Sequence, residues 1–561
     1  MSEPEIHIAD AMIAAALAIE DEMARQRVDP PDYGDPPPRD EDNPIREHRI
    51  DGSDPRPVVR LSPDQAAVAD AAESALALRG GVYVRGLKLV HIVRDRGSSD
   101  WLIRPDGSPM IVRIERDHLM DLLSRSAIWV SSRALKDGTT KEFETSPPVW
   151  LAARILARGQ WKFPQLESIS DAPVFRSDGS IHETPGYDDH TRVIFDPCGV
   201  TFPSVPTTPS HAQATKAFAD LLEPFSEFPF VADTDRATVG AMILSVIGRN
   251  AIAGCVPMFI AQAPTPGSGK GLLVDAVATI ATGRRAPLMA PTDEDEETRK
   301  RLMSIAIESP AMVVIDNVEG PLGSPSLAMA LTAGIVRDRL LGTMETVTAS
   351  LRPVWCVTGN NVQLKGDLGR RVIPIDLDPQ VEHPEDRTFA RGNLLGYVSS
   401  QRPRLVAAAL TVLRAYVVAE SPVHGLTAKG SFEEWDHLIR GAVIWSCGAD
   451  PLGGIARIRE KSDDDLEKIR ALLTAWHLSM GALPMTVADA IRHAETAPDL
   501  KDALASYCRG GRPDSRQLGY VLRKICGRVV NGLVMRKSSM NRDSITKWAI
   551  ERVLTYEDRN V

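Results

Sequence analysis

The sequence predicts a multidomain protein in which an α+β module precedes a central α/β domain with a parallel sheet, and a small domain of helices and strands ends the chain. Three observations support this fold class. The 561 residues suffice for roughly three to four domains of about 150 residues each. Hydrophobic residues make up 43% and charged residues 25%, which is typical of folded chains and excludes global disorder. Strand and helix patterns alternate from about residue 256 to 379, as in a parallel sheet with crossover helices.

Charge and cysteine content narrow the functional classes. Lysine and arginine total 65 against 75 acidic residues, which gives a net charge of -10. This charge excludes a protein that coats nucleic acid along its whole length, so any contact with nucleic acid must come from local basic patches. The six cysteines stand singly without a C-x-x-C pair, so we expect neither a disulfide framework nor a zinc knuckle, and a cytoplasmic location. The longest early apolar run, residues 12–19, is too short for a membrane span, so we expect no membrane partner.

The first 60 residues divide into a helix and a linker. Apolar residues such as Ile8, Met12 and Ile19 recur at helical spacing and predict an amphipathic helix within residues 1–28. Residues 29–60 are rich in proline and acids and read as a linker. Two interpretations of the helix stay open: it binds a partner or a second copy, or it packs on its own chain.

Residues 61–210 predict an α+β accessory module. Helical patterns cover 66–78, 118–126 and 148–158, and residues 81–94 predict a hairpin with its turn near Gly86. The run Tyr-Asp-Asp-His at 187–190 permits a metal site. Two acids in a turn rich in glycine and proline are more typical of a solvated loop, which is our interpretation.

The motif with the clearest chemistry is Ala-Pro-Thr-Pro-Gly-Ser-Gly-Lys, which ends at Lys270 between a predicted strand and a predicted helix. Its glycines let backbone N–H groups face phosphate oxygens, the helix N-terminus adds positive potential, and Lys270 reaches the β and γ phosphates. The consensus glycine and hydroxyl positions hold Pro264 and Gly271, so Mg²⁺ ligation by the loop stays open. We expect ATP to contact Pro266, Gly267, Ser268, Gly269, Lys270 and Gly271.

Two later strands end in polar residues suited to the same site. The strand predicted at 310–315 ends in Asp316, which can hold Mg²⁺ through water. A glutamate that polarises the attacking water would follow, but the chain has Asn317 and, two places on, Glu319, so the general base stays open. The strand predicted at 352–358 leads to Asn360, whose amide would align the water; an ordinary Gly-Asn-Asn turn is the alternative.

Two arginines precede the next predicted strand, at 372–377. Arg370 and Arg371 enter a buried strand, which is costly unless each meets an anion. That anion is either the γ-phosphate of a neighbouring subunit, where an arginine contributes about 10³–10⁵ in rate, or a carboxylate of the same subunit.

The candidate site residues follow one another along the chain in the order Lys270, Asp316, Asn360 and the pair Arg370/Arg371. The last of them lie within the sequence Thr-Gly-Asn-Asn…Gly-Asp-Leu-Gly-Arg-Arg. This arrangement resembles the superfamily 3 helicases of the AAA+ class, and among them the poxvirus-type primase-helicase ATPases of phages, plasmids and mobile elements. The resemblance is strong over residues 257–379. It implies a central AAA+ P-loop ATPase with ATP and Mg²⁺ as cofactors, bound between the subunits of a ring, expected to be a hexamer.

The resemblance also implies roles for several further residues. A β-hairpin within residues 338–348 would touch single-stranded DNA in the ring channel, and Lys365 is a further channel or interface cation. The weaker likeness over 163–188 and 435–440 makes Arg440 a candidate sensor 2 arginine. Residues before 211 offer no convincing pair of catalytic carboxylates on adjacent strands, so we predict no primase activity.

The C-terminal region is predicted separately to bind DNA. Three short helices and then two strands, at 528–537 and 545–550, follow the order of a winged helix. Residues 501–561 carry 13 basic and six acidic side chains, a local net charge of +7. A solvated basic face or a protein-docking domain remains the alternative. The expected DNA contacts are Arg516, Arg523, Lys524, Arg536 and Lys537.

These observations predict a DNA-dependent ATPase, a ring-forming replicative helicase or helicase-like motor acting on single-stranded or forked DNA, with a replication partner possible at the N-terminal helix. An ATP-switched initiator or loader with little hydrolysis is the alternative, favoured by Gly271 and Asn317. A small-molecule phosphotransferase is disfavoured, because Leu272 replaces the threonine of the adenylate kinase loop. Beyond residue 60 the expected domains are an accessory module (61–210), the AAA+ core with preceding helices (211–400), a helical lid or connector (401–481) and a winged helix (482–561).

Overall fold

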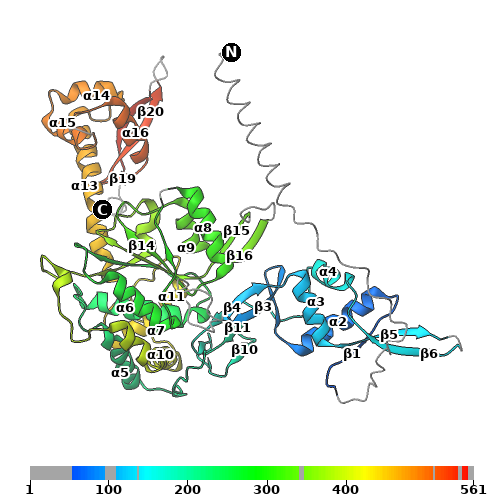
Figure 1. Ribbon diagram of the computed structural model, residues 1–561. Coiled ribbons are helices and arrows are strands. Elements are labelled where there is room, and N and C mark those ends of the chain that lie inside the picture. Colours follow the sequence, from blue (N-terminus) through cyan, green and yellow to red (C-terminus); the bar gives the residue numbers. More distant parts are fainter. Residues whose placement is uncertain are drawn as a thin grey trace, which may run out of the picture. The chain divides into compact units, whose positions relative to one another are not determined.

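The computed structural model describes residues 54–94, 109–135, 138–292, 294–339, 346–508, 512–540 and 546–553 (Figure 1). The predicted N-terminal helix and nearly all of its linker lie outside the described residues. The chain forms two compact units. Of the described residues, one unit comprises those up to 79 together with those within 116–157, and the other comprises those within 80–115 together with those from 158 on.

The first unit packs helices against a small mixed sheet. Strand β1 pairs in parallel with β5, and β5 pairs antiparallel with β6. Leu76, Leu119 and Trp129 are fully buried in its core. All three helices predicted for this part of the chain are confirmed. In chain order its elements are β1 (Val58–Arg60), α2 (Gln65–Arg79), α3 (Arg116–Ser126), β5 (Ile128–Ala134), β6 (Thr140–Thr145) and α4 (Trp150–Ala157).

Small sheets begin the second unit. The predicted hairpin is confirmed: β2 and β3 pair antiparallel around Gly86, whose φ of +59° is the left-handed conformation that favours glycine. Strand β4 extends this sheet, and short pairs follow. The strands are β2 (Val82–Arg85), β3 (Lys88–Arg94), β4 (Pro109–Arg113), β7 (Ser168–Ser170), β8 (Val174–Phe175), β9 (Ile181–His182), β10 (Gly186–Asp188) and β11 (Val193–Phe195).

The acidic run at 187–190 is a solvated loop only in part: Asp189 and His190 are exposed in a turn, as predicted, whereas Asp188 is a buried residue of β10. Asp188 is 3% exposed and accepts hydrogen bonds from Arg176 at 2.6 Å and from Thr191 at 2.7 Å. Burial raises the pKa of Asp188, but these hydrogen bonds outweigh it and hold the pKa well below the usual range. Among the described residues, no three metal-ligating side chains gather at one place. Asp188 therefore joins β10 to the turn between β8 and β9 by an ion pair with Arg176.

A five-stranded parallel sheet forms the centre of the second unit, as predicted. Its strand order is β13-β14-β17-β12-β18, and every neighbouring pair is parallel. The three inner strands are buried along nearly their whole length, because helices cover both faces. The strands are β12 (Met258–Ala263), β13 (Leu288–Met289), β14 (Met312–Val318), β17 (Val354–Asn360) and β18 (Val372–Asp376).

Alternate side chains of each strand pack into different layers, because successive side chains point to opposite faces of a sheet. Phe259 and Cys356 belong to one large cluster with α5, α6, α7 and α10, whereas Ile260 and Trp355 join the opposite cluster with α8 and α9. The helices are α5 (His211–Leu222), α6 (Asp233–Ile247), α7 (Lys270–Thr282), α8 (Asp295–Glu308), α9 (Pro325–Ala333), α10 (Leu394–Val418), α11 (Glu433–Trp435), α12 (Gly441–Cys447) and α13 (Ile455–Met480).

The C-terminal region confirms the predicted helices and corrects the strands. The run predicted as one strand at 528–537 is a hairpin, because Asn531 and Gly532 have φ of +52° and +69° and make a tight turn. A three-stranded antiparallel sheet results. The elements are α14 (Val487–Ala494), α15 (Pro498–Ala505), α16 (Ser515–Ile525), β19 (Val529–Val530), β20 (Leu533–Met540) and β21 (Thr546–Arg552). A search of the described helices finds none with the length and apolarity needed to span a bilayer.

Candidate functional site

Polar residues gather where three neighbouring parallel strands end. In the sheet, β17 lies between β14 and β12, so the segments that follow these strands are adjacent. The register places Asn360 beside Ala263, the last residue of β12, and Val357 beside Ile315, the residue before Asp316. Carboxyl ends of parallel strands are where α/β sheets bind ligands. The sheet therefore brings the loop that ends at Lys270 to the edge that also holds Asp316 and Asn360.

The loop between β12 and α7 has the backbone of an anion cradle. Gly267 and Gly269 have φ of +73° and +87°, which only glycine adopts without strain. The first hydrogen bond of α7 joins the Leu273 N–H to the Gly269 carbonyl at 2.9 Å. The amides of the three residues between them consequently have no partner within the helix. These N–H groups and the helix dipole favour a phosphate group at this point.

Bonds within the loop hold its lysine in place. The Ser268 hydroxyl donates to the Thr265 carbonyl at 2.6 Å, and the Lys270 ammonium donates to the same carbonyl at 3.2 Å. Burial lowers the pKa of Lys270, since no acid offsets the loss of water. The ammonium thus lies over the loop, close to the amides that would hold a phosphate.

Sequence reasoning missed the residues that pack against this loop. A Cβ atom at Gly269 would lie 3.3 Å from Phe228, and one at Gly267 would lie 3.0 Å from a carboxylate oxygen of Glu385. Gly271, in contrast, is exposed, and a Cβ there would meet no atom within 4 Å. Phe228 and Glu385 come from segments distant in sequence, so no local pattern could reveal them.

Asp316 is held at a bulge in β14. The register between β14 and β17 shifts after Ile315, and Asn317 has a φ of +53°. The Thr358 hydroxyl donates to Asp316 Oδ1 at 2.5 Å and accepts from the Asn317 N–H at 2.9 Å. Thr358 thus fixes both the carboxylate and the bulge. Its sequence context, a β-branched residue in a strand, gave no indication of this role.

Asn360 has an unusual hydrogen-bonding state. Its side-chain oxygen is buried and has no hydrogen-bond partner among the described residues. A buried acceptor without a partner costs about 1–3 kcal/mol, and native structures contain few of them. Because Asn360 is registered beside the residue that opens the loop, this oxygen offers a hydrogen-bond site to a ligand or water there.

A chain of polar contacts connects β12, the strand that leads into the glycine-rich loop, to neighbouring segments. Gln262, the residue before the end of β12, accepts a hydrogen bond from the Val362 N–H at 3.2 Å and donates to Asp376 at 2.7 Å. Asp376 in turn accepts from Arg457 of α13 at 2.5 Å. Arg457 also pairs with Asp235, whose burial raises its pKa to about 6. The tip of β17, the loop strand and the start of α13 are therefore tied together.

The two predicted arginines have different surroundings. Arg371 has a side chain that is 15% exposed; it donates to Asp367 at 2.7 Å and to Thr332 at 3.2 Å, and it bonds the Ala328 carbonyl of α9. Arg370 has a side chain that is 68% exposed and pairs with Asp367. Arg371 therefore joins α9 to the turn before β18, whereas Arg370 remains accessible.

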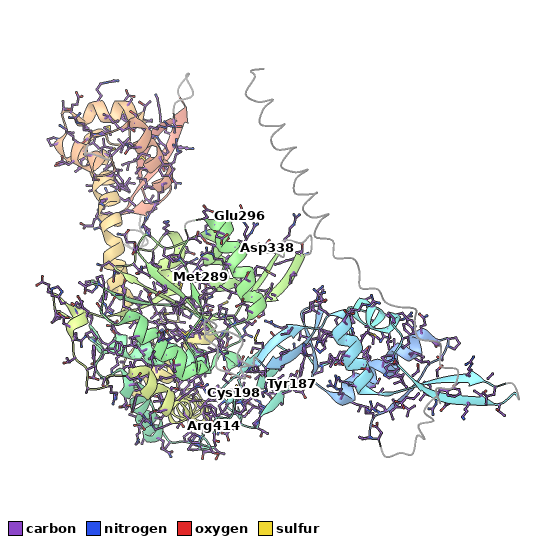
Figure 2. The ribbon with its side chains drawn as sticks, viewed as in Figure 1. Tyr187, Cys198, Met289, Glu296, Asp338 and Arg414 are labelled. Carbon is purple, nitrogen blue, oxygen red and sulfur yellow. The ribbon has the colours of Figure 1, made fainter. Side chains whose placement is uncertain are left out.

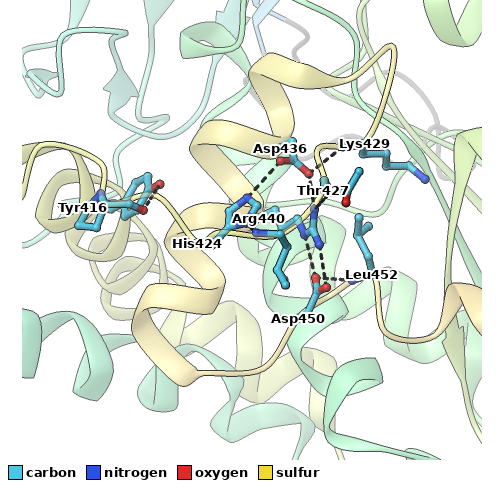
Figure 3. Close-up of polar contacts among 10 residues, drawn as sticks. Tyr416, His424, Thr427, Lys429, Asp436, Arg440, Asp450 and Leu452 are labelled. Carbon is cyan, nitrogen blue, oxygen red and sulfur yellow. Dashed lines mark hydrogen bonds and ion pairs between the residues drawn. The ribbon is translucent and has the colours of Figure 1, made fainter.

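Arg440 lies inside a polar network instead of facing a nucleotide (Figure 3). Its side chain is 4% exposed and pairs with Asp436 and Asp450, both at 2.8 Å. Asp436 also accepts from His424 at 3.1 Å. Arg440 lies in the π-helical segment between α11 and α12, and its contacts join this segment to Thr427 before it and to Asp450 after α12. The guanidinium is therefore fully hydrogen-bonded within the fold.

The segment that the resemblance assigns to DNA contact forms a hairpin. Strands β15 (Ile335–Arg339) and β16 (Thr346–Ser350) pair antiparallel, and the tip between them lies outside the described residues. Asp338, labelled in Figure 2, pairs with Arg299 of α8 at 2.8 Å. Arg337 and Arg339 are exposed on β15. The hairpin thus offers two cations beside its tip.

The basic side chains predicted to contact DNA are exposed. On α16, Arg516, Arg523 and Lys524 are exposed, while Leu518 and Leu522 are buried in the core of this region. The sequence analysis missed Tyr520, which is 67% exposed and lies one turn from Arg516 and Arg523 on the same face. On β20, Arg536 and Lys537 are exposed, and Arg536 pairs with Glu551 at 3.5 Å.

No family model matches the chain, and no curated protein matches it. Among solved structures, it is similar to the apo A form of the NrS-1 C-terminal region, with 11% identity and a TM-score of 0.35 over 73% of this chain and 92% of that chain. A second structure of that region gives 10% identity and a TM-score of 0.39 over 86% and 98%. Inhibitor-bound JCV helicase gives 14% identity and a TM-score of 0.18 over 48% of this chain and 73% of that one. At these values the likenesses carry no argument about function.

Proposed function

We propose that the protein is a DNA-dependent ATPase, a ring-forming replicative helicase or helicase-like motor of a phage or mobile element. The proposal rests on one observation above all: the Asn360 oxygen is buried, has no hydrogen-bond partner in the described part of the chain, and lies beside the glycine-rich loop at the same sheet edge as Asp316. An orphaned acceptor next to unpaired helix amides fits a phosphate group and the water that attacks it.

Each residue then has a defined role. The amides after Gly269 and the Lys270 ammonium hold the β and γ phosphates. Asp316, oriented by Thr358, is the residue that would hold Mg²⁺ through water, and the Asn360 oxygen would accept a hydrogen bond from the attacking water. Bound Mg²⁺ would neutralise charge on the phosphate oxygens. Arg370, the accessible arginine of the pair, would reach the γ-phosphate of a neighbouring subunit in the ring.

The DNA-binding part of the proposal rests on exposed cations in two places. The hairpin β15–β16 presents Arg337 and Arg339 for single-stranded DNA in the ring channel. The C-terminal helices and hairpin would act as a winged helix, with Arg516, Tyr520 and Arg523 of α16 facing the nucleic acid. Arginines contact phosphates, and an exposed aromatic ring stacks on a base or packs on a sugar.

Steady-state ATP turnover with and without single-stranded DNA tests the proposal directly. A motor hydrolyses ATP faster when DNA is present, because translocation couples ATP hydrolysis to movement along the DNA. Turnover that requires Mg²⁺ and rises with added DNA supports the motor. Tight ATP binding with negligible turnover in both conditions would reject it.

Neutralising α16 should weaken DNA binding in a salt-dependent way. We expect Arg523→Ala to reduce the slope of log affinity against log salt by about one, because one phosphate contact is lost. Arg492→Ala is the matched control, since Arg492 is an equally exposed arginine of the same region on α14. Fluorescence anisotropy with a labelled oligonucleotide at several salt concentrations measures both slopes. Equal slopes for the two variants would exclude α16 from the DNA contact.

The alternative function is an ATP-switched initiator or loader that hydrolyses ATP slowly. It is favoured by Gly271, which offers no hydroxyl to Mg²⁺, and by Asn317 at the place of a catalytic glutamate. In this case ATP binding alone would change DNA affinity.

Gly271→Ser distinguishes the two functions. The position is open, with no atom within 4 Å of an added Cβ, and its φ is not positive, so serine fits without strain. If hydrolysis is limited by the missing hydroxyl, we expect Mg²⁺-dependent turnover to rise by roughly tenfold, since one added ligand to the phosphates' metal stabilises charge by about 1.4 kcal/mol. Gly430→Ser, in an exposed turn with equally open space, is the control. Unchanged turnover would mean that another step limits the rate.

A further inference from the structure

A cavity of about 600 Å³ lies at the opposite edge of the central sheet from the candidate active site. Its walls include residues that come immediately before β13, β14 and β17, such as Pro287, Pro310 and Pro353. Asp316 and Asn360 lie near the other ends of β14 and β17. The cavity is therefore a separate site, and it has no part in the function proposed above.

Four arginines line this cavity, and among the residues that the structure describes two of them meet a carboxylate. Arg284 pairs with Asp171 at 2.9 Å, and Arg285 pairs with Asp275 at 3.4 Å. The other two, Arg249 and Arg352, donate only to backbone carbonyls within the described part of the chain.

The hydrogen bonds of Arg249 and Arg352 bring their two charges together. Arg249 Nε donates to the Arg352 carbonyl at 2.9 Å and Nη1 to the Ile252 carbonyl at 2.9 Å, and Arg352 bonds the same Ile252 carbonyl. Arg249 Nη2 makes no hydrogen bond to any described residue. One guanidinium nitrogen thus remains available beside a second positive side chain.

Keeping these two charges together is costly. Arg249 is 7% exposed, and burial together with the charge of Arg352 lowers its pKa to about 9. A buried charge without a counterion is strongly unfavourable, and proteins normally pair such charges. An anion in the cavity would relieve the repulsion and use the remaining donors.

The rest of the lining suits a ligand with a phosphate end and a less polar end. Met110, Ile111 and Ile169 supply apolar surface, and Asn250 and Ser350 supply polar groups. Of the acids that line the cavity, Asp171 is neutralised by Arg284, and the other two, Glu167 and Glu308, are exposed. The volume falls within the range of pockets for small organic ligands, about 300–1,000 Å³.

We infer that this cavity binds a small phosphate-bearing ligand of nucleotide size, with its phosphate group between Arg249 and Arg352. Bidentate contacts from paired guanidinium groups are the geometry that phosphate favours. The strands that the cavity abuts lead directly to Asp316 and Asn360, so the ligand would stabilise the sheet on which the active site stands.

The test uses the full chain carrying Lys270→Ala, so that the glycine-rich loop contributes little. Inorganic pyrophosphate and ADP are titrated by calorimetry into this protein and into versions that also carry Arg352→Met or Arg249→Met. Arg470→Met on α13, an exposed arginine far along the chain, is the control. Thermal unfolding of each variant shows whether it folds, and Arg352→Met serves if Arg249→Met does not.

We expect one saturable site for pyrophosphate or ADP in the Lys270→Ala protein. Its affinity should fall on the order of tenfold to a hundredfold with either methionine substitution, because a charged hydrogen bond is lost, and stay unchanged with Arg470→Met. Absence of saturable binding, or binding that survives Arg352→Met in a folded protein, would overturn the inference. A short oligodeoxythymidine that binds here while pyrophosphate and ADP do not would also overturn it, since the occupant would then be a DNA backbone.

Discussion

Lys270→Ala is expected to reduce ATP turnover by about 10²- to 10³-fold or more, the usual loss when one group that stabilises transition-state charge is removed. The lysine ammonium lies over the loop, bonded to the Thr265 carbonyl at 3.2 Å, and burial has already lowered its pKa. ATP binding should weaken as well, because the ammonium meets the phosphates in the ground state. A coupled assay of phosphate release with saturating single-stranded DNA measures the loss.

The matched control for this substitution is Lys300→Ala. Lys300 is an exposed lysine of α8 that pairs with Glu296 four residues earlier, so its removal changes the charge by the same amount outside the loop. We expect its turnover to stay within about twofold of the unmodified protein, because exposed ion pairs contribute about 0–1 kcal/mol. Turnover of Lys270→Ala equal to that of Lys300→Ala would show that phosphates are not bound at this loop.

Asn360→Ala should separate binding from chemistry. We expect kcat to fall by about 10²-fold, as for the loss of one oriented hydrogen-bonding group, while ATP affinity changes little. The reason is that the buried Asn360 oxygen has no partner among the residues the structure describes, and so becomes engaged only when the site is filled. Single-turnover hydrolysis gives the chemical step, and a fluorescent ATP analogue gives the affinity.

The neighbouring asparagine provides the control for this second prediction. Asn361 is exposed and has a φ of +46°, so Asn361→Gly removes an amide without backbone strain. Its backbone N–H bond to the Ala263 carbonyl, 3.2 Å long, is kept. Equal losses in the two variants would indicate that the turn, and not the Asn360 amide, matters for hydrolysis. A loss of affinity as large as the loss in kcat would argue for a role in binding.

Much of the central domain could be predicted because its elements are set by local patterns. Each core strand is a short apolar run, and its boundaries carry proline, glycine or a polar residue; Asp316 and Asn360 were located in this way. The glycine-rich loop was recognisable because its backbone demands glycine at positions 267 and 269. The prediction of a solvated loop was wrong for Asp188 but not for the exposed Asp189, since the partner Arg176 meets Asp188 only in the folded chain.

The remaining features depend on pairings between distant segments. The position of β17 between β14 and β12 determines which residues meet at the site. This strand order depends on how the strands pair and cannot be read from their composition. Thr358 orients Asp316 across that pairing, 42 residues later in the chain. The same holds for the arginines. Arg371 bonds to α9, and Arg440 pairs with Asp436 and Asp450, only because folding brings these segments together.

The left-handed backbone at Asn317 limits how an acidic side chain could be placed at the end of β14. A φ of +53° is tolerated by asparagine because its short side chain compensates locally, whereas a glutamate there would be strained by about 1–2 kcal/mol. The Thr358 hydroxyl also accepts a hydrogen bond from the Asn317 N–H, which this backbone conformation orients toward it. Exchanging the side chain alone therefore would not install a working base. The extra residue of the bulge would first have to be removed so that the strand becomes regular. Only then could an acidic side chain at the end of the strand act as a base.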